Sequence, residues 1–192
     1  VINSLFLATF FPNLVKIPSY VRQGGLDTFL LKPVETQFLV SIREIDLGSL
    51  ANVLLGLVLV VHSGSRLDLQ LTPRVVVAYL LLLITGTTIL YSLFFMISCA
   101  SFWLSDASWF VDLYFTGNSF ADKPSDIYRG LVSRILLYLV PLAVVANAPA
   151  SVMVRGLLAD KVLVAVMTSV SLFLVARWVW LMGLKTYEGT SG

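Results

Sequence analysis

Long apolar runs alternate with short charged stretches along the whole chain. About 20 apolar residues, rising about 1.5 Å each in a helix, cross the roughly 30 Å hydrocarbon core of a bilayer. Residues 47–65 meet this length, and we predict a membrane-spanning helix there. Residues 75–105 exceed it, so the second span must tilt, bend or protrude. Residues 135–154 and 162–184 are predicted to be the last two spans.

Three further stretches lack the pattern of a complete span. Residues 1–15 are apolar but contain Pro12, with Pro18 beyond, so we expect a partial span, the end of a helix that begins upstream. Residues 107–118 alternate aromatic side chains with polar ones and are expected to lie along the membrane surface. Residues 148–161 are apolar but short, and are expected to enter the outer leaflet and return.

Composition places the chain among integral membrane proteins. Hydrophobic residues make up 58% of the sequence and charged residues only 12%, which leaves too little polar surface for a soluble domain of 192 residues. The net charge of +2 is spread over separate stretches, whereas nucleic-acid binding needs lysines and arginines on one face. Nucleic acid is therefore excluded as a partner, and a single membrane domain over residues 1–192 accounts for the pattern.

Residues 20–46 form a charged segment between apolar runs, the 20–46 loop. It contains seven of the 24 charged residues of the chain, and each would cost a few kcal/mol in hydrocarbon. The loop must therefore face water. Placing it in the cytoplasm puts nine of the 13 lysines and arginines on that side, where basic residues are retained. The same topology places the C-terminus in the cytoplasm.

The chain offers little catalytic chemistry. Residues 183–186 reproduce only the Gly-Leu-Lys-Thr end of a phosphate-binding loop, so the chain is not expected to bind ATP in that way. His62 is the only histidine, which excludes a His-Glu-x-x-His zinc site, and it has no nucleophile or carboxylate near it in sequence. Cys99 is the only cysteine and cannot form an intrachain disulfide. We therefore predict no catalytic residues, no metal ligands and no cofactor bound by this chain.

Small and polar residues within the spans are expected to serve helix packing. Gly48, Asn52 and Gly56 follow one another at intervals of four residues, so they share one helix face, where another backbone can approach closely. Charged residues at span ends, such as Arg134 and Arg177, are expected to extend toward lipid headgroups.

The loop and the start of the next span, PSYVRQGGLDTFLLKPVETQFLVSIREIDLGSLANVLLG, resemble the bacterial ABC-2 type exporter permeases. The matching residues are Arg22, Gly25, Leu26, Asp27, Leu30, Leu31, Lys32, Pro33, Arg43 and Asp46. The similarity continues through residues 121–130 to the basic end at residues 184–187 and covers nearly the whole chain. The resemblance implies an all-α, polytopic membrane helical bundle, the last five of six transmembrane helices, with the first helix and part of the second absent upstream.

In such permeases a cytoplasmic coupling helix seats in a cleft of a separate ABC ATPase subunit, and the resemblance implies that role near residues 25–38. The implied docking residues are Gly25, Leu26, Asp27, Leu30, Leu31, Lys32 and Pro33. The residues agree with this role, because Gly24 and Gly25 permit a sharp turn, Asp27 can cap a short helix and Pro33 limits its length. An amphipathic loop lying on lipid is the alternative interpretation.

The resemblance implies the permease subunit of an ATP-binding-cassette exporter in the bacterial inner membrane. A second permease subunit, identical or related, would complete the substrate pathway, and ATP and Mg are expected in the partner ATPase. A non-transporting membrane scaffold is an alternative, since packing and a docking loop would suffice for it. An ion-coupled carrier would need paired charges deep in the spans, whereas the acidic residues here lie in loops or near span ends.

Overall fold

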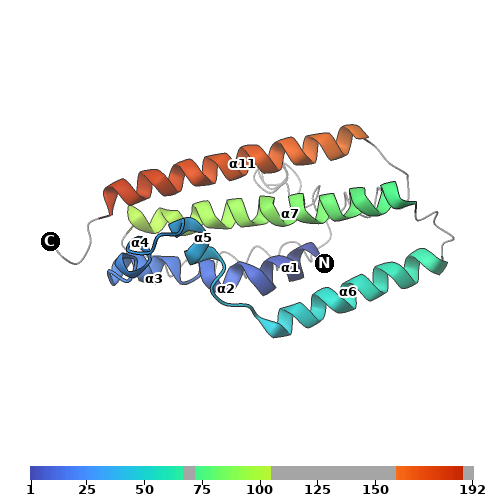
Figure 1. The fold of residues 1–192 in the computed structure, drawn as a ribbon, viewed down its shortest axis with the longest axis horizontal. Helices are drawn as coiled ribbons and strands as arrows, with labels where there is room; N and C mark the ends of the chain where they lie inside the picture. Colours follow the sequence, from blue (N-terminus) through green and yellow to red (C-terminus); the bar gives the residue numbers. More distant parts are fainter. Residues whose placement is uncertain (67–71, 105–158, 188–192) are drawn as a thin grey trace, which may run out of the picture.

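The computed structural model describes residues 1–66, 72–104 and 159–187, and every regular element within these ranges is a helix. Three of these helices are long and apolar enough to cross a membrane: α6 (Leu47–Arg66), α7 (Pro73–Cys99) continued by the 3₁₀ turn η1 (Ala100–Phe102), and α11 (Ala159–Thr186). They extend along one common direction (Figure 1). The prediction of an all-α membrane bundle is confirmed for the described residues.

The first described segment is a series of short helices, α1 (Ile2–Thr9), α2 (Phe11–Leu14) and α3 (Ile17–Arg22). Pro12 and Pro18 are the second residues of α2 and α3. Proline has no N–H to donate, and its ring collides with the preceding helical turn, so a helix breaks or restarts there. The expected partial span is therefore interrupted at both prolines.

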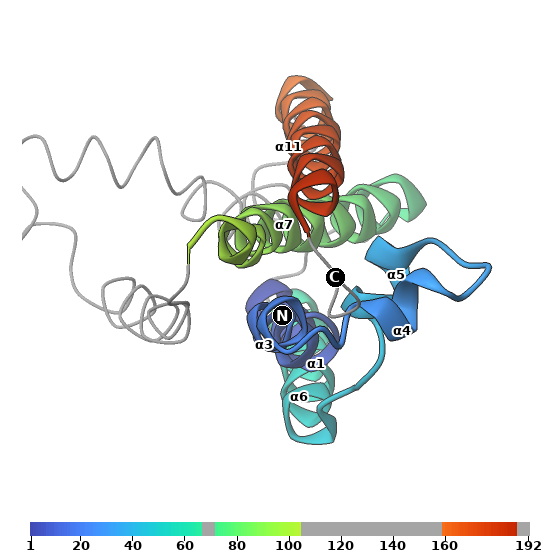
Figure 2. The same cartoon turned by 90° about the vertical axis from the view of Figure 1, so that its left-hand side faces the viewer.

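The helices pack as a stack in which α7 lies between α11 and α1, and α1 lies between α7 and α6 (Figure 2). α7 and α11 run in the same direction, toward the end of the bundle that carries the 20–46 loop (Figure 1). The span predicted at residues 135–154, the surface helix at residues 107–118 and most of residues 148–161 lie outside the described residues.

α7 changes its surroundings along its length. In its first half, several apolar side chains are exposed, among them Val77, Leu80 and Ile84. Over residues 85–99 none is exposed, because α1, α3 and α11 pack against this half. The excess length predicted for this span is therefore used for packing at the end that carries the 20–46 loop.

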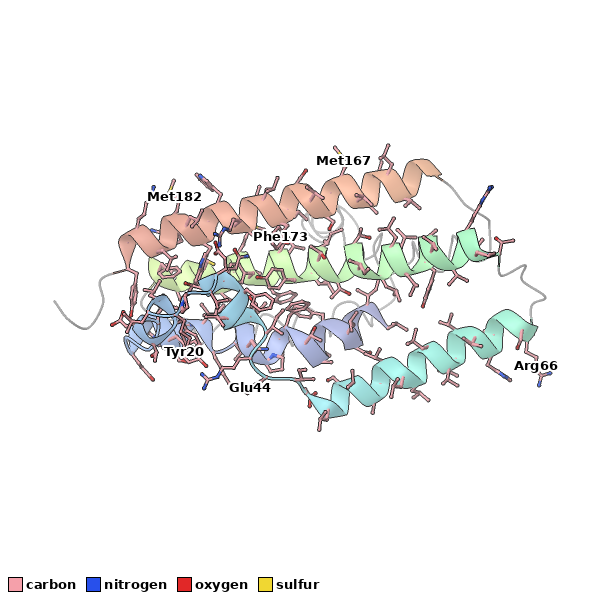
Figure 3. The ribbon with its side chains drawn as sticks, viewed as in Figure 1. Tyr20, Glu44, Arg66, Met167, Phe173 and Met182 are labelled. Carbon is pink, nitrogen blue, oxygen red and sulfur yellow. The ribbon has the colours of Figure 1, made fainter. Side chains whose placement is uncertain are left out.

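α6 and α11 carry large apolar side chains on their outer surfaces. Val58 of α6 and Leu174 of α11 are more than half exposed. Figure 3 shows Met167 and Met182 on the outer side of α11. Apolar surface of this extent is unstable in water, and hydrocarbon can cover it because the helical backbone is internally hydrogen-bonded.

At the end of the bundle that carries the 20–46 loop, α7 and α11 meet through aromatic rings and a glycine. These parts of the two helices are their inner ends. The Trp180 ring is fully buried, with its centroid 5.3 Å from that of Phe95 and 5.5 Å from that of Phe102. A Cβ atom placed on Gly183 would lie 2.2 Å from the Phe102 ring. Glycine is therefore required for this close approach. Gly183, the first of the phosphate-loop-like residues 183–186, therefore serves helix packing, whereas Lys185 and Thr186 are exposed.

We expect Gly183→Ala to lower the free energy of unfolding by about 1–3 kcal/mol, because the added methyl group must displace Phe102 from a packed interface. The measurement is thermal unfolding of the purified protein in detergent. Gly48→Ala is the matched control, since a Cβ at Gly48 would meet only the Asp46 carboxylate, at 3.5 Å and 3.8 Å. Equal midpoints for the two variants would contradict the packing role of Gly183.

Candidate functional site

The 20–46 loop folds at one end of the bundle, close to the C-terminal end of α11, into two short helices, α4 (Asp27–Leu30) and α5 (Thr36–Ser41) (Figures 1 and 2). The chain enters α4 through a tight turn, in which Gly24 has φ 70°. Glycine adopts this left-handed conformation without steric cost. The Leu26 N–H donates to the Tyr20 carbonyl and the Asp27 N–H to the Gly24 carbonyl, both at 3.3 Å.

The start of α4 corrects one expectation. Asp27 does not cap the helix; Leu26 occupies the N-cap position, and no side chain makes a capping hydrogen bond there. The reason is the turn at Gly24, which already accepts the Asp27 N–H and draws Asp27 into the first helical turn. Pro33 follows the end of α4 at Leu30, as its missing N–H predicts.

The predicted docking residues divide between the interior and the surface. Leu26 is fully buried, so it supports the loop from inside and is not available to a partner. Gly25 and Asp27 are half-buried, while Leu30, Leu31, Lys32 and Pro33 are exposed. Four exposed apolar residues of the loop lie within or next to the predicted docking segment and are named the docking surface after that prediction: Leu30, Leu31, Val34 and Phe38; Leu31 is 86% exposed and Phe38 58%. Lys32 and Glu35 supply exposed charges beside it.

Phe29 fixes α4 so that the docking surface faces outward. Its ring is buried, with its centroid 5.1 Å from that of Tyr20. The Arg43 guanidinium lies 5.7 Å and the Lys32 ammonium 6.0 Å from the ring centroid. Cations are attracted to an aromatic face at these distances. Phe29 is therefore part of the interior beneath the loop.

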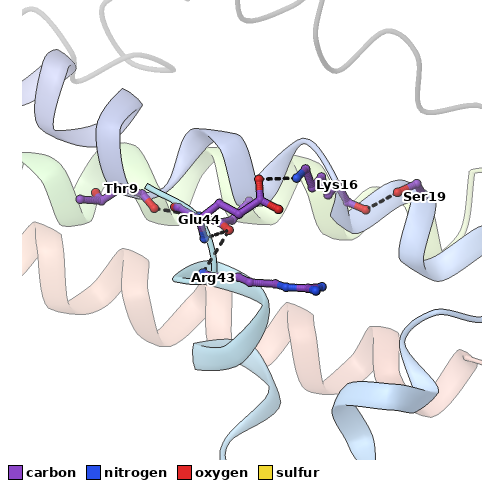
Figure 4. Close-up of polar contacts among 6 residues, drawn as sticks. Thr9, Lys16, Ser19, Arg43 and Glu44 are labelled. Atoms are coloured by element: carbon purple, nitrogen blue, oxygen red, sulfur yellow. Dashed lines mark hydrogen bonds and ion pairs between the residues drawn. The ribbon is translucent and has the colours of Figure 1, made fainter. Parts of the chain in front are cut away.

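Asn13 attaches the returning end of the loop to α2. Its side-chain amide donates to the carbonyls of Thr9 and Glu44, both at 2.9 Å. Its oxygen accepts the N–H groups of Arg43 at 3.1 Å and Glu44 at 2.9 Å (Figure 4). Because Asn13 is buried and all these groups are paired, the contact fixes the loop backbone without leaving a polar atom unsatisfied.

An ion pair between Lys16 and Glu44 adds to this attachment (Figure 4). The pKa of Glu44 lies below its ordinary value of 4.5, mainly because Lys16 donates a hydrogen bond to the carboxylate and also because the Lys16 charge attracts it. Both side chains are substantially exposed, so the pair contributes little to stability compared with the buried Asn13 contacts.

Asp46 begins α6. Its carboxylate accepts the Gly48 N–H at 3.2 Å and the Ser49 N–H at 3.0 Å, which is the hydrogen-bonding pattern of an N-cap. Hydrogen bonds from the Ser49 side chain and backbone lower the pKa of Asp46. The Asp46 N–H donates to the Ala8 carbonyl at 2.8 Å. Asp46, one of the residues that match the family pattern, therefore joins α6 to α1.

Gln37 and Glu35 connect the loop to two of the long helices, α7 and α11. The Gln37 amide donates to the Tyr91 hydroxyl of α7 at 3.1 Å and accepts from the Arg177 guanidinium of α11 at 3.2 Å. A second Arg177 nitrogen lies 2.8 Å from a Glu35 carboxylate oxygen. Sequence reasoning placed Arg177 among lipid headgroups; its partners are these two loop residues. The available signal was an arginine within an apolar run, which requires a partner.

The predicted packing residues of α6 lie as follows. Gly48 and Asn52 are exposed on the surface of the chain. Gly56 is close to the first residue, since a Cβ there would lie 2.8 Å from a methyl carbon of Val1. α6 and α1 therefore approach each other at Gly56. His62 is exposed near the far end of α6.

The described part of the chain holds no group of three or more histidine, cysteine, aspartate or glutamate side chains placed to bind a metal ion. The long apolar helices, the apolar outer surface and the water-facing loop define an integral membrane protein of the all-α class. The family model described as ABC-2 family transporter protein matches residues 1–191. The chain belongs to that family, whose members are membrane components of ABC transporters and not themselves catalytic.

Family membership makes the protein a permease subunit and implies an ATPase partner. The comparison with curated proteins found no match, and the comparison with solved structures found none.

We expect Asn13→Asp to destabilise the protein by about 1–3 kcal/mol, because a carboxylate cannot donate to the Thr9 and Glu44 carbonyls and would face them in a buried site. Denaturant unfolding in detergent measures the change. Gln23→Glu makes the same chemical change at an exposed position nearby and should leave stability almost unchanged. Similar losses in both variants would contradict the anchoring role of Asn13.

The Lys16–Glu44 pair should make stability depend on pH in a defined direction. Because the folded-state pKa of Glu44 lies below 4.5, its contribution is complete above that value and is lost as pH falls through the folded-state pKa. Wild type should therefore melt above Glu44→Gln at neutral pH, and the difference should vanish in acid. Melting points across the acidic range test this; a constant difference would exclude the ion pair as its cause.

Proposed function

We propose that this permease subunit belongs to an ATP-binding-cassette exporter of the bacterial inner membrane and that the 20–46 loop receives a separate ABC ATPase from the cytoplasm. The observation that carries the proposal is the docking surface, four exposed apolar side chains between residues 30 and 38 of a water-facing loop. Exposed apolar residues with a polar rim are typical of the core of a protein interface. The ATPase would hold ATP and Mg, and a second permease subunit, identical or related, would complete the pathway.

The arrangement of charges supports this orientation. Tyr20 and Glu44 lie toward one end of the bundle and Arg66 lies at the other (Figure 3). The C-terminal end of α11 lies at the same end of the bundle as the loop (Figure 1). Retention of basic residues on the cytoplasmic side favours the loop end, which carries most of the lysines and arginines of the described residues.

An apolar surface of this kind can bind either a protein or the lipid surface. The charged residues beside the docking surface distinguish these two partners. Lipid-bound amphipathic segments carry mainly basic residues on the polar face. Here the exposed charges are Lys32 and Glu35, and Asp27 is the first residue of α4. Mixed charge next to apolar side chains favours a protein partner with its own polar rim.

We expect Leu31→Asp to reduce the amount of ABC ATPase that co-purifies with the protein by about tenfold or more, since a charge at the centre of an interface removes a dominant contact. Ile45→Asp is the matched control, because Ile45 is an exposed apolar residue of the same loop outside the docking surface. Quantitative mass spectrometry of the complex measures the ATPase.

Two results would contradict the proposal. An undiminished ATPase yield from Leu31→Asp would remove the docking surface, and absence of any ABC ATPase from the wild-type complex would remove the exporter assignment. If the ATPase binds but nucleotide drives no solute or lipid movement in vesicles, the scaffold alternative holds.

A further inference from the structure

Gln37 is the point at which the loop meets two transmembrane helices. Its side chain is 5% exposed and lies between Tyr91 of α7 and Arg177 of α11. An amide can donate and accept at once, and Gln37 does so with a different helix on each side. A shift of α5 must therefore move both helices or break at least one of these hydrogen bonds.

The direction of the hydrogen bonds can be assigned from the available protons. The Ser41 hydroxyl donates its only proton to the backbone carbonyl of Gln37 at 2.6 Å. The 2.8 Å contact between the Ser41 and Tyr91 hydroxyls must then use the Tyr91 proton. The Tyr91 oxygen is left to accept from the Gln37 amide. Each hydroxyl proton is used once, so the network has one arrangement.

Tyr91 is held rigidly enough to transmit a displacement. Its ring centroid lies 4.8 Å from that of Phe10, 5.3 Å from Phe95 and 6.2 Å from Phe173. These rings belong to the first segment, to α7 and to α11. The hydroxyl therefore projects toward α5 from a cluster that already connects the core of the bundle.

Arg177 makes the position of the loop obligatory. It lies inside the apolar stretch Val162–Thr186, where an unpaired charge costs several kcal/mol. Two of its nitrogens reach Gln37 and Glu35, as a planar guanidinium permits. Withdrawing the loop would leave this charge without its partners.

We propose that Glu35, Gln37, Tyr91 and Arg177 form the coupling network through which movement of the docked loop is passed to α7 and α11 together. This inference rests on the proposed function. The docking surface receives the ATPase, whereas Gln37 lies on the buried side of α5 and contacts Tyr91 and Arg177 there. Glu35, the exposed N-cap residue of α5, links the two regions through its ion pair with Arg177. Its loss should leave the ATPase bound and the helices unresponsive.

The test measures hydrogen–deuterium exchange in the purified complex, with and without ATP, Mg and vanadate. In the wild type, the nucleotide should change exchange in the loop and in the inner ends of α7 and α11. Tyr91→Phe removes the shared hydroxyl but keeps the ring, and Arg177→Met removes the charge but keeps much of the length. Both should retain the ATPase and the response of the loop, while the response of α7 and α11 falls about fivefold or more.

Matched variants distinguish a loss of transmission from a loss of folding. Tyr79→Phe removes the hydroxyl of a buried tyrosine in the same helix outside the network and should respond as the wild type does. Arg177→Lys keeps a charge beside Glu35 and should retain more of the response than Arg177→Met. Thermal unfolding of each complex shows whether a variant is folded.

The outcomes distinguish the two proposals. If no ABC ATPase binds the wild type, the proposed function fails. If the ATPase binds and the loop responds, but α7 and α11 respond equally in wild type, Tyr91→Phe and Arg177→Met, the coupling network is refuted while docking stands. A wild-type response confined to the loop would also refute it.

Discussion

The charge of Arg177 within an apolar helix is the constraint on which the loop end of the structure depends. A guanidinium in this position needs partners that hydrocarbon cannot supply. Glu35 and Gln37 supply them, and in doing so they bring a water-facing loop against α11. The same placement aligns Gln37 with Tyr91, so that one charged group fixes the position of α5 relative to both long helices.

The long helices could be predicted closely from the sequence because transfer to hydrocarbon depends on local composition. The span predicted at residues 47–65 is α6, Leu47–Arg66, and the run at residues 75–105 is α7 with η1. The effect of Pro12 and Pro18 was also local, since each proline removes a donor from its own turn. What composition could not reveal was that the inner half of α7 would be covered by the first segment.

The contacts that hold the loop join residues far apart in the chain. Asn13 and Glu44 are separated by 31 residues, Gln37 and Tyr91 by 54, and Arg177 and Gln37 by 140. No periodicity encodes such pairs. The sequence indicated a candidate docking segment but not its division into buried and exposed side chains, because a four-residue helix is too short to show an apolar stripe. Tyr20 and Arg43 decide that Phe29 faces inward.

The polar contacts at α5 respond to displacement differently from the apolar contacts between α7 and α11. Hydrogen bonds weaken steeply with distance and angle, so Gln37 either moves with its partners or parts from them. Rings such as Trp180 and Phe95 can slide slightly while remaining in contact, because dispersion has little directional preference. Gln37 attaches the loop to α7 and α11, and a second attachment, to Asn13, follows it in the chain. In the proposed mechanism, force applied to the neighbouring docking surface would reach α7 and α11 through Gln37 as a discrete change in position.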